Sequence, residues 1–222
     1  MHDEKPEKPP NNLIERPTGA LSVERVDPSE FNAVARILAM AYSDDPIHIW
    51  AMPNANAATR LNDATVFFKL YLRWMRPDNR DVFATSDRSS VQVSSVVRKG
   101  ESAYPDGVRH LPPMIRNLSR VNDYFQWIET FRPNVDHRHA EFIGSLPNAS
   151  RPTGFFLYTK VLQIFDREGL PVWTWSSNPT NLPMYRRLGF KISDELRRDP
   201  STPPVNILWR PPMPLRDGGK CQ

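Results

Sequence analysis

The sequence predicts one α/β domain built on a mixed central sheet with helices on both faces. The chain has 222 residues, 39% of them hydrophobic and 24% charged, which suffices for a single domain with a sizeable core. Segments typical of strands and of helices follow one another as strands, then helices, then a strand–helix–strand alternation towards the C-terminus. This order, with no visible internal repeat, favours one mixed sheet.

The strands are predicted from short runs of β-branched and other apolar residues that alternate with polar ones or are bounded by turn residues. In chain order they are residues 21–26, 82–85, 91–97, 140–146, 172–176, 190–192 and 205–209. The second and third flank the polar turn from Ser86 to Ser89, which predicts that they pair with each other.

The helices are predicted between these strands. They cover about 30–42, 57–75, 114–131, 153–167 and 179–188. Asp44-Asp45-Pro46 follows the first helix, and Pro77 and Pro133 follow the second and third, so that each helical pattern ends close to a proline. Glu168-Gly169 caps the fourth helix and Gly189 closes the fifth.

The two ends of the chain are predicted to lie outside the folded domain. Residues 1–19 are charged and rich in proline and asparagine, and they cannot bury enough apolar surface to offset the entropy cost of ordering. The segment after Pro211 is polar. We therefore expect a disordered N-terminal arm over 1–19, a domain over 20–212 and a flexible tail over 213–222.

Composition excludes several classes of protein. The net charge is +4 and the lysines and arginines are scattered, which argues against a nucleic-acid partner but is compatible with a phosphate-bearing small ligand. The single cysteine, Cys221, allows no intramolecular disulfide and favours a reducing compartment. The polar start lacks the apolar region of a signal peptide, and no apolar run approaches about 20 residues. The expected location is cytoplasmic, without a membrane partner.

The strongest motif lies between Trp173 and Phe190. A strand leads to Asn181, then to a short helix bearing Tyr185, and then to the corner Leu188-Gly189-Phe190. This combination resembles the late motif of the GNAT (N-acetyltransferase) superfamily. Three further segments are similar to parts of that family. Ala41–Pro46, with Trp50 and Pro53, resembles its puromycin-acetyltransferase-like branch, Ile143–Pro147 its central strand, and Trp209–Pro211 its last strand. The similarity is dense only after residue 139.

The resemblance implies a GNAT-like sheet with a splayed pair of parallel strands that admits coenzyme A, with acetyl-CoA or another acyl-CoA as co-substrate. The pantetheine arm would pair with the exposed backbone of the central strand as an added strand does. The pyrophosphate would lie at the N-terminus of the next helix, where free N–H groups and the helix dipole favour negative charge. Carried over to this sequence, the cofactor-binding residues are Ile143, Gly144, Ser145, Leu146, Arg151, Thr153, Gly154, Phe155 and Asn181.

The phosphate-binding turn departs from the family pattern, which is Gln/Arg-x-x-Gly-x-Gly/Ala. Aligned on Gly154 as the last glycine, the pattern places Ala149 at the Gln/Arg position and Pro152 at the middle glycine. Aligned on Arg151, it keeps the arginine and the middle glycine but places Phe156 at the last one. Neither alignment is complete, and Pro152 has no N–H to donate to a phosphate.

Two residues are the candidates for catalysis. The resemblance implies that Tyr185 protonates the departing thiolate; the alternative is an aromatic side chain packed at the edge of the core. The family branch often has a glutamate in the late strand where this chain has Trp175, so Glu141 on the central strand is the candidate general base. The alternative for Glu141 is a solvated carboxylate at the strand edge.

Four charged motifs leave two interpretations open. His137 and His139 could be metal ligands, but no third ligand has a supporting spacing, so solvated or strand-entry histidines are favoured and no metal is expected. Asp44-Asp45 could bind a cation or an amine, or could simply end a helix. Arg186-Arg187 and Arg197-Arg198 could contact the adenosine phosphates of the cofactor, or could form solvated faces.

The sequence thus predicts an acyl-CoA-dependent N-acetyltransferase that acts on an amine of a small molecule. The alternative is a protein of the same fold that no longer transfers acyl groups and uses its cleft for binding or for another reaction on a pathway intermediate. The sequence identifies neither the acceptor nor the oligomeric state.

Overall fold

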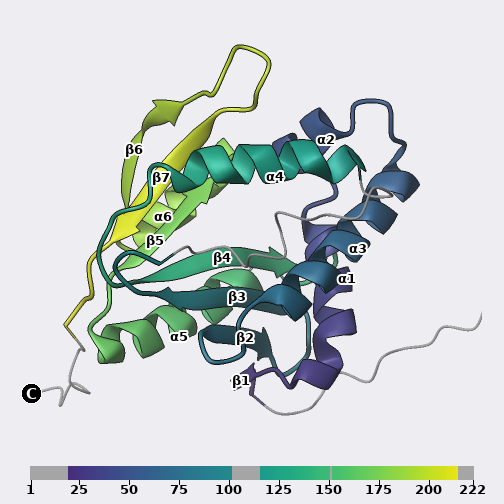
Figure 1. The fold of residues 1–222 in the computed structure, drawn as a ribbon. Coiled ribbons are helices and arrows are strands. Elements are labelled where there is room, and N and C mark those ends of the chain that lie inside the picture. Colours follow the sequence, from purple (N-terminus) through teal and green to yellow (C-terminus); the bar gives the residue numbers. More distant parts are fainter. Residues whose placement is uncertain (1–19, 102–115, 151, 215–222) are drawn as a thin grey trace, which may run out of the picture.

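A computed structural model describes residues 20–101, 116–150 and 152–214, and its centre is a seven-stranded mixed sheet (Figure 1). Across the sheet the strand order is β1-β2-β3-β4-β5-β7-β6, and β4 and β5 are the one parallel pair among the described strands. The strands are β1 (Val23–Arg25), β2 (Arg80–Thr85), β3 (Ser90–Val97), β4 (His137–Ser145), β5 (Val172–Ser176), β6 (Lys191–Leu196) and β7 (Val205–Arg210). The predicted fold class is confirmed.

Helices cover both faces of this sheet. They are α1 (Phe31–Ala41), α2 (Pro46–Ala51), α3 (Ala57–Trp74), α4 (Arg116–Glu129), α5 (Pro152–Glu168) and α6 (Leu182–Arg187), with 3₁₀ turns η1 (Pro28–Glu30) and η4 (Pro179–Asn181). The apolar sides of α1, α3 and α4 bury a core against Val93, Phe142 and Trp173. On the other face, α5 and α6 bury a second core against Ala140, Val172 and Leu208. Figure 1 shows α5 on the opposite side of the sheet from α3 and α4.

Three elements differ from the sequence-based prediction. Strand β6 was expected over 190–192 and extends to Leu196. Pro46 does not only follow a helix; it begins α2, because the Asp45 side chain accepts a hydrogen bond from the Ile47 amide (2.8 Å) and caps a new helix. Strand β4 begins at His137, three residues before the predicted start, because His137 and Arg138 are buried and pair with β3. The predicted arm over 1–19 and the tail from 215 lie outside the described residues.

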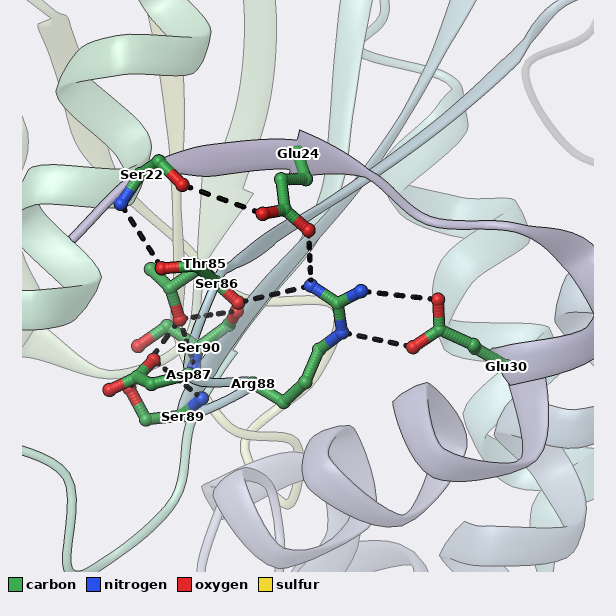
Figure 2. A network of polar contacts seen from close by, with 9 residues as sticks. All are labelled: Ser22, Glu24, Glu30, Thr85, Ser86, Asp87, Arg88, Ser89 and Ser90. Atoms are coloured by element: carbon green, nitrogen blue, oxygen red, sulfur yellow. Dashed lines mark hydrogen bonds and ion pairs between the residues drawn. The ribbon is translucent and has the colours of Figure 1, made fainter. Parts of the chain in front are cut away.

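The turn between β2 and β3 ties the sheet edge together (Figure 2). Arg88 has a positive φ of 54°, and its guanidinium donates to Glu30 (2.9 Å) and to Glu24 (3.0 Å). The same turn reaches β4, because the Leu146 amide donates to the Ser89 carbonyl (2.9 Å) and the hydroxyls of Ser90 and Ser145 lie 2.7 Å apart. The C-terminal end of β4 is therefore held by the β2–β3 turn.

A buried ion pair fixes the corner Leu188-Gly189-Phe190. Asp166 on α5 accepts two hydrogen bonds from Arg210 on β7 (2.6 and 2.8 Å), and both side chains are more than nine-tenths buried. Arg210 also donates to the Leu188 carbonyl (2.8 Å), while Gly189 takes a φ of +86° that favours glycine. The corner that follows α6 is thereby attached to both α5 and the sheet.

We predict that Asp166→Ala lowers the free energy of unfolding by about 3–5 kcal/mol, because it leaves the Arg210 guanidinium buried without its partner. Asp136→Ala is the control, since it removes an exposed ion pair with Arg98 and a hydrogen bond from the Lys99 amide, and it is expected to lower the free energy of unfolding much less. Urea denaturation of both variants measures the difference. Equal losses would contradict the structural role given to Asp166.

Candidate functional site

Strands β4 and β5 pair only at their N-terminal ends. Within the described residues the register joins Arg138 to Val172 and His139 to Trp173 and goes no further. At the next step the Thr174 hydroxyl donates to the Ala140 carbonyl (2.7 Å), in place of a backbone amide. Beyond this bond β4 stays paired with β3, and β5 with β7, so the two strands diverge, as Figure 1 also shows. The expected splayed strand pair is present.

A β-bulge lies on β4 where the two strands part. Phe142 faces Val93 and Ala140 faces Ser94, so Glu141 is the extra residue of β4 between these pairs. The Glu141 side chain is 1% exposed, and its Oε1 accepts a hydrogen bond from the Ser95 hydroxyl (2.5 Å). The alternative interpretation of Glu141 is a solvated carboxylate at the strand edge. The burial of its side chain rules this interpretation out.

A groove of about 710 Å³ occupies the space between the ends of the two strands. It is lined by Ala41, Ile143, Gly144, Ser145, Pro152, Gly154, Phe155, Asn178, Asn181, Met184 and Arg187. Six of the predicted cofactor-binding residues therefore meet there: Ile143, Gly144, Ser145, Gly154, Phe155 and Asn181. They come from β4, from the first turn of α5 and from the segment after β5.

Three of the predicted cofactor-binding residues are not in the groove lining. Leu146 packs against the core on the α1/α3 face. Thr153 is buried, and its amide donates to the Ser150 carbonyl (3.0 Å) because the chain turns there into α5. Arg151 lies outside the described residues. The start of α5 thus faces the groove with Gly154 and Phe155.

One glycine is required by close approach in this region. A Cβ atom on Gly144 would lie 2.7 Å from the Cβ of Ala41, which is fixed by the backbone of α1, so glycine allows α1 to pack this closely against β4. A Cβ atom on Gly154 would lie 2.7 Å from the Ser145 hydroxyl oxygen, which would have to rotate away from its contact with Ser90.

A smaller cavity of about 170 Å³ adjoins the groove, since Ala41, Ile143, Asn178 and Asn181 line both. Its other lining residues are Tyr42, Asp44, Asp45, Glu141, Phe142, Trp175, Ser176, Ser177 and Tyr185. The two predicted catalytic residues, Glu141 and Tyr185, are thus brought to one cavity from opposite faces of the sheet.

Burial sets the protonation of both groups. Burial raises the pKa of Glu141 to about 7, against the lowering effect of hydrogen bonds from Ser95 and Tyr71; the charge of Glu129 adds to the rise. Burial also raises the pKa of Tyr185, so its phenol keeps its proton at neutral pH. Glu141 can therefore accept a proton near neutrality, and Tyr185 has one to give.

Tyr185 is both a packed aromatic residue and a residue of the cavity lining. It is 5% exposed, and its ring meets Phe190 edge-on at 5.4 Å and Tyr158 at 6.0 Å between centroids, as a core aromatic does. The same side chain also lines the small cavity. The packing fixes the ring direction, so a core position and a position at the cavity are compatible.

The cavity also contains Tyr42, which was not predicted as a site residue, and Asp45, for which binding of a cation or an amine and the end of a helix were both left open. The Tyr42 hydroxyl accepts a long hydrogen bond from the Ile143 amide (3.4 Å), and burial, with the nearby Tyr185 and Asp45, raises its pKa. Asp45 accepts a hydrogen bond from the Ser177 hydroxyl (3.0 Å). The acidic pair with Asp44 was a signal for an amine site. Nothing local marked Tyr42.

The two histidines of β4 are buried side chains at the entry to the strand, so the strand-entry interpretation is confirmed and the solvated one is wrong. His139 is 1% exposed, its ring lies 4.7 Å from that of Trp173, and burial holds its pKa well below the usual value. The Nδ1 atom of His137 lies 2.6 Å from the Val135 carbonyl oxygen. Among the described residues, no group of three His, Cys, Asp or Glu side chains could hold a metal ion.

Comparison with solved structures identifies the fold. An acetyltransferase from Corynebacterium glutamicum, described as "histone acetyltransferase HPA2 and related acetyltransferase", matches 89% of this chain and 99% of its own with a TM-score of 0.63 and 15% identity. A mosquito arylalkylamine N-acetyltransferase like 5b matches 86% of this chain and 100% of its own, with a TM-score of 0.61 and 12% identity. The condensation domain of Ebony, in complex with β-alanyl-dopamine, matches 86% of this chain and 99% of its own, with a TM-score of 0.59 and 10% identity.

These likenesses define the class: the chain has the fold of the GNAT N-acetyltransferases. At 15% identity or less they show the fold alone. No family model matches the sequence, and no curated protein does. The likeness to the puromycin-acetyltransferase-like branch stays a prediction. Over the part of the chain that is described, no helix is both long and apolar enough to cross a membrane.

We predict that Thr174→Val lowers the free energy of unfolding by about 1–3 kcal/mol, because it leaves the Ala140 carbonyl without the donor that ends the strand pairing. Thr174→Ser keeps the hydroxyl and is expected to stay closer to the wild type. Denaturant titration of the two variants measures this. If Val and Ser are equally tolerated, the hydroxyl does not hold the strands where they part.

Proposed function

We propose that the protein is an acyl-CoA-dependent N-acyltransferase that acetylates an amine of a small molecule. The observation that carries the proposal is the junction of the groove between β4 and β5 with a cavity that contains a buried carboxyl group and a buried phenol. The fold supports it, because the fold is that of N-acetyltransferases. A cytoplasmic location, expected from the composition, is part of the same proposal.

The groove fits the arm of an acyl-CoA. Backbone groups of β4 beyond Ala140 are turned towards a strand that has diverged, so an extended ligand can pair with them as an added strand. Asn181 adds a side-chain amide, since as the N-cap residue of α6 it makes no capping hydrogen bond; Asn178 is engaged by the amide of Thr180 (3.0 Å). The bound acyl-CoA would supply the reactive thioester.

The small cavity fits an amine. Asp44 and Asp45 contribute carboxylates to its lining and Glu141 contributes a carboxyl group, and none of the described residues that line it is a lysine, arginine or histidine. Such a site attracts an ammonium group and disfavours an anion. The rings of Tyr42 and Trp175 add apolar walls, so a small amine with an apolar body would fit.

The chemistry requires two proton movements. The ammonium must lose a proton before its nitrogen can attack the thioester carbonyl, and Glu141, with a pKa of about 7, is the proposed acceptor of that proton. As the carbon–sulfur bond breaks, Tyr185 would donate its phenolic proton to the departing sulfur. The shared walls of groove and cavity hold the two reactants together, which lowers the entropy cost of reaction.

We predict that the wild type binds coenzyme A and transfers acetyl groups to small amines, and that Tyr185→Phe keeps the binding but loses roughly 10²-fold in turnover, as expected for a general acid. Calorimetric titration and an assay of free thiol measure the two effects. Tyr124→Phe is the control, because the Tyr124 hydroxyl donates to the Pro203 carbonyl (2.7 Å) outside the cavity. Unchanged turnover in Tyr185→Phe would remove Tyr185 from the mechanism.

We predict a pH dependence caused by Glu141. Because its pKa is about 7 in the folded protein and ordinarily 4.5, the folded state binds this proton more tightly. That stabilisation is complete below pH 4.5 and is lost as the pH rises through 7. Relative to Glu141→Gln, the wild type should lose about 3 kcal/mol of unfolding free energy over this range. Its transfer rate should rise with pH through about 7.

Denaturation at several pH values tests this dependence on Glu141. The control is Glu195→Gln at an exposed position, which should change the unfolding free energy by about 1 kcal/mol or less at each pH. The prediction fails if the difference in unfolding free energy between the wild type and Glu141→Gln is the same at every pH, because the pKa of Glu141 would then be equal in the folded and unfolded states.

A second candidate function is a binding protein that transfers no acyl group. It is favoured by the turn before α5, where Pro152 has no N–H and the Thr153 amide is already bonded to Ser150. A wild type that fails to bind coenzyme A in the titration above would decide for this candidate.

A further inference from the structure

The turn before α5 offers few donors for a phosphate group. Pro152 has none, the Thr153 amide donates to Ser150, and the Ala149 amide donates to Leu146 (2.9 Å). In a GNAT-like site this turn would be the usual cradle for the pyrophosphate of the donor. The first turn of α5 keeps two further amides that face the groove, those of Gly154 and Phe155. If the groove accepts an acyl-CoA, as proposed above, a charged side chain from another element would add to these few donors.

Arg187, the last residue of α6, is placed for this role. Of the described residues that line the groove, it is the one with a charged side chain. Its guanidinium makes no hydrogen bond or ion pair with any residue in the described ranges 20–101, 116–150 and 152–214. Arg186 precedes it in the same helix and is also exposed, but does not line the groove.

We propose that Arg187 binds a phosphate group of the acyl donor and takes over part of the task that the turn before α5 cannot perform. A guanidinium forms two parallel, charge-assisted hydrogen bonds with phosphate oxygens and stays protonated at all working pH values. The inference rests on the proposed function, since it concerns the donor of that reaction. Of the two arginines of α6, Arg187 would thus contact the phosphate group, and Arg186 would remain a solvated side chain.

The structural alternative is an interaction with the helix end. Basic residues in the last turn of a helix interact favourably with its dipole, and both arginines of α6 lie in that turn. A dipole role would therefore apply to Arg186 and Arg187 alike. The groove distinguishes them, so Arg186 is a matched control on the same helix.

The test is calorimetric titration of the wild type, Arg187→Ala and Arg186→Ala with coenzyme A, dephospho-coenzyme A and pantetheine. We expect Arg187→Ala to weaken coenzyme A binding roughly 10-fold or more, as the loss of a hydrogen bond to a charged group does. Arg186→Ala should bind as the wild type does. Pantetheine carries no phosphate, so its affinity should be the same for all three proteins.

The two smaller ligands locate the contact. A penalty that persists with dephospho-coenzyme A assigns Arg187 to the pyrophosphate, and one that disappears assigns it to the 3′-phosphate; both support the inference. Arg187→Lys should retain part of the affinity, because it keeps the charge but not the paired donors.

Three results would overturn the inference, and they are distinguishable. If the wild type binds coenzyme A and Arg187→Ala binds it equally well, Arg187 has no phosphate role, while the proposed function stands. If the wild type binds neither coenzyme A nor pantetheine, the proposed donor is wrong and the inference falls with it. Equal weakening in Arg186→Ala and Arg187→Ala would favour a general charge effect over a specific contact.

Discussion

The hydrogen bond from the Thr174 hydroxyl to the Ala140 carbonyl is the point on which the site depends, because backbone pairing between β4 and β5 ends there. A continuous ladder would leave no room for a ligand between these strands. With the strands apart, each keeps its other neighbour: the β2–β3 turn holds the end of β4, and the ion pair of Asp166 with Arg210 holds the corner after α6. The opening is therefore a rigid feature of two well-anchored strands.

Charge is divided along the opening. The groove has Arg187 at its wall, and the cavity beyond it has Asp44, Asp45 and Glu141. An anionic donor and a cationic acceptor would each meet the opposite charge at its own end. Burial of Glu141 raises the pKa of its carboxyl group into the range that suits proton transfer at neutral pH.

The sequence predicts the architecture well because periodicity and turn residues are local signals. All seven strands and five helices lie close to their predicted positions. The motif of Asn181, Tyr185 and Leu188-Gly189-Phe190 led to the groove through Asn181 and to the cavity through Asn181 and Tyr185. Helix α2 was missed because Asp45-Pro46 can follow one helix and begin the next.

The missing parts of the site depend on distant contacts. Glu141 is buried because a bulge interrupts the alternation of side-chain direction along β4. No residue type in this segment predicts a bulge. Ser177 meets Asp45 across 132 positions of the chain. The engagement of the Thr153 amide depends on how the chain enters α5. Such details follow from the assembled sheet and cannot be derived from any short segment.

The walls that the groove and the cavity share have a kinetic consequence. Ala41, Ile143, Asn178 and Asn181 line both spaces, so a molecule in the groove becomes part of the surface that the second molecule meets. The sheet then has two parts that are joined along residues 138–140 and 172–174. In the proposed complex, an extended ligand would lie between them as an eighth strand. For the proposed reaction, the first arrival completes the chamber in which the second is recognised, which favours an ordered sequence of binding with the donor before the acceptor.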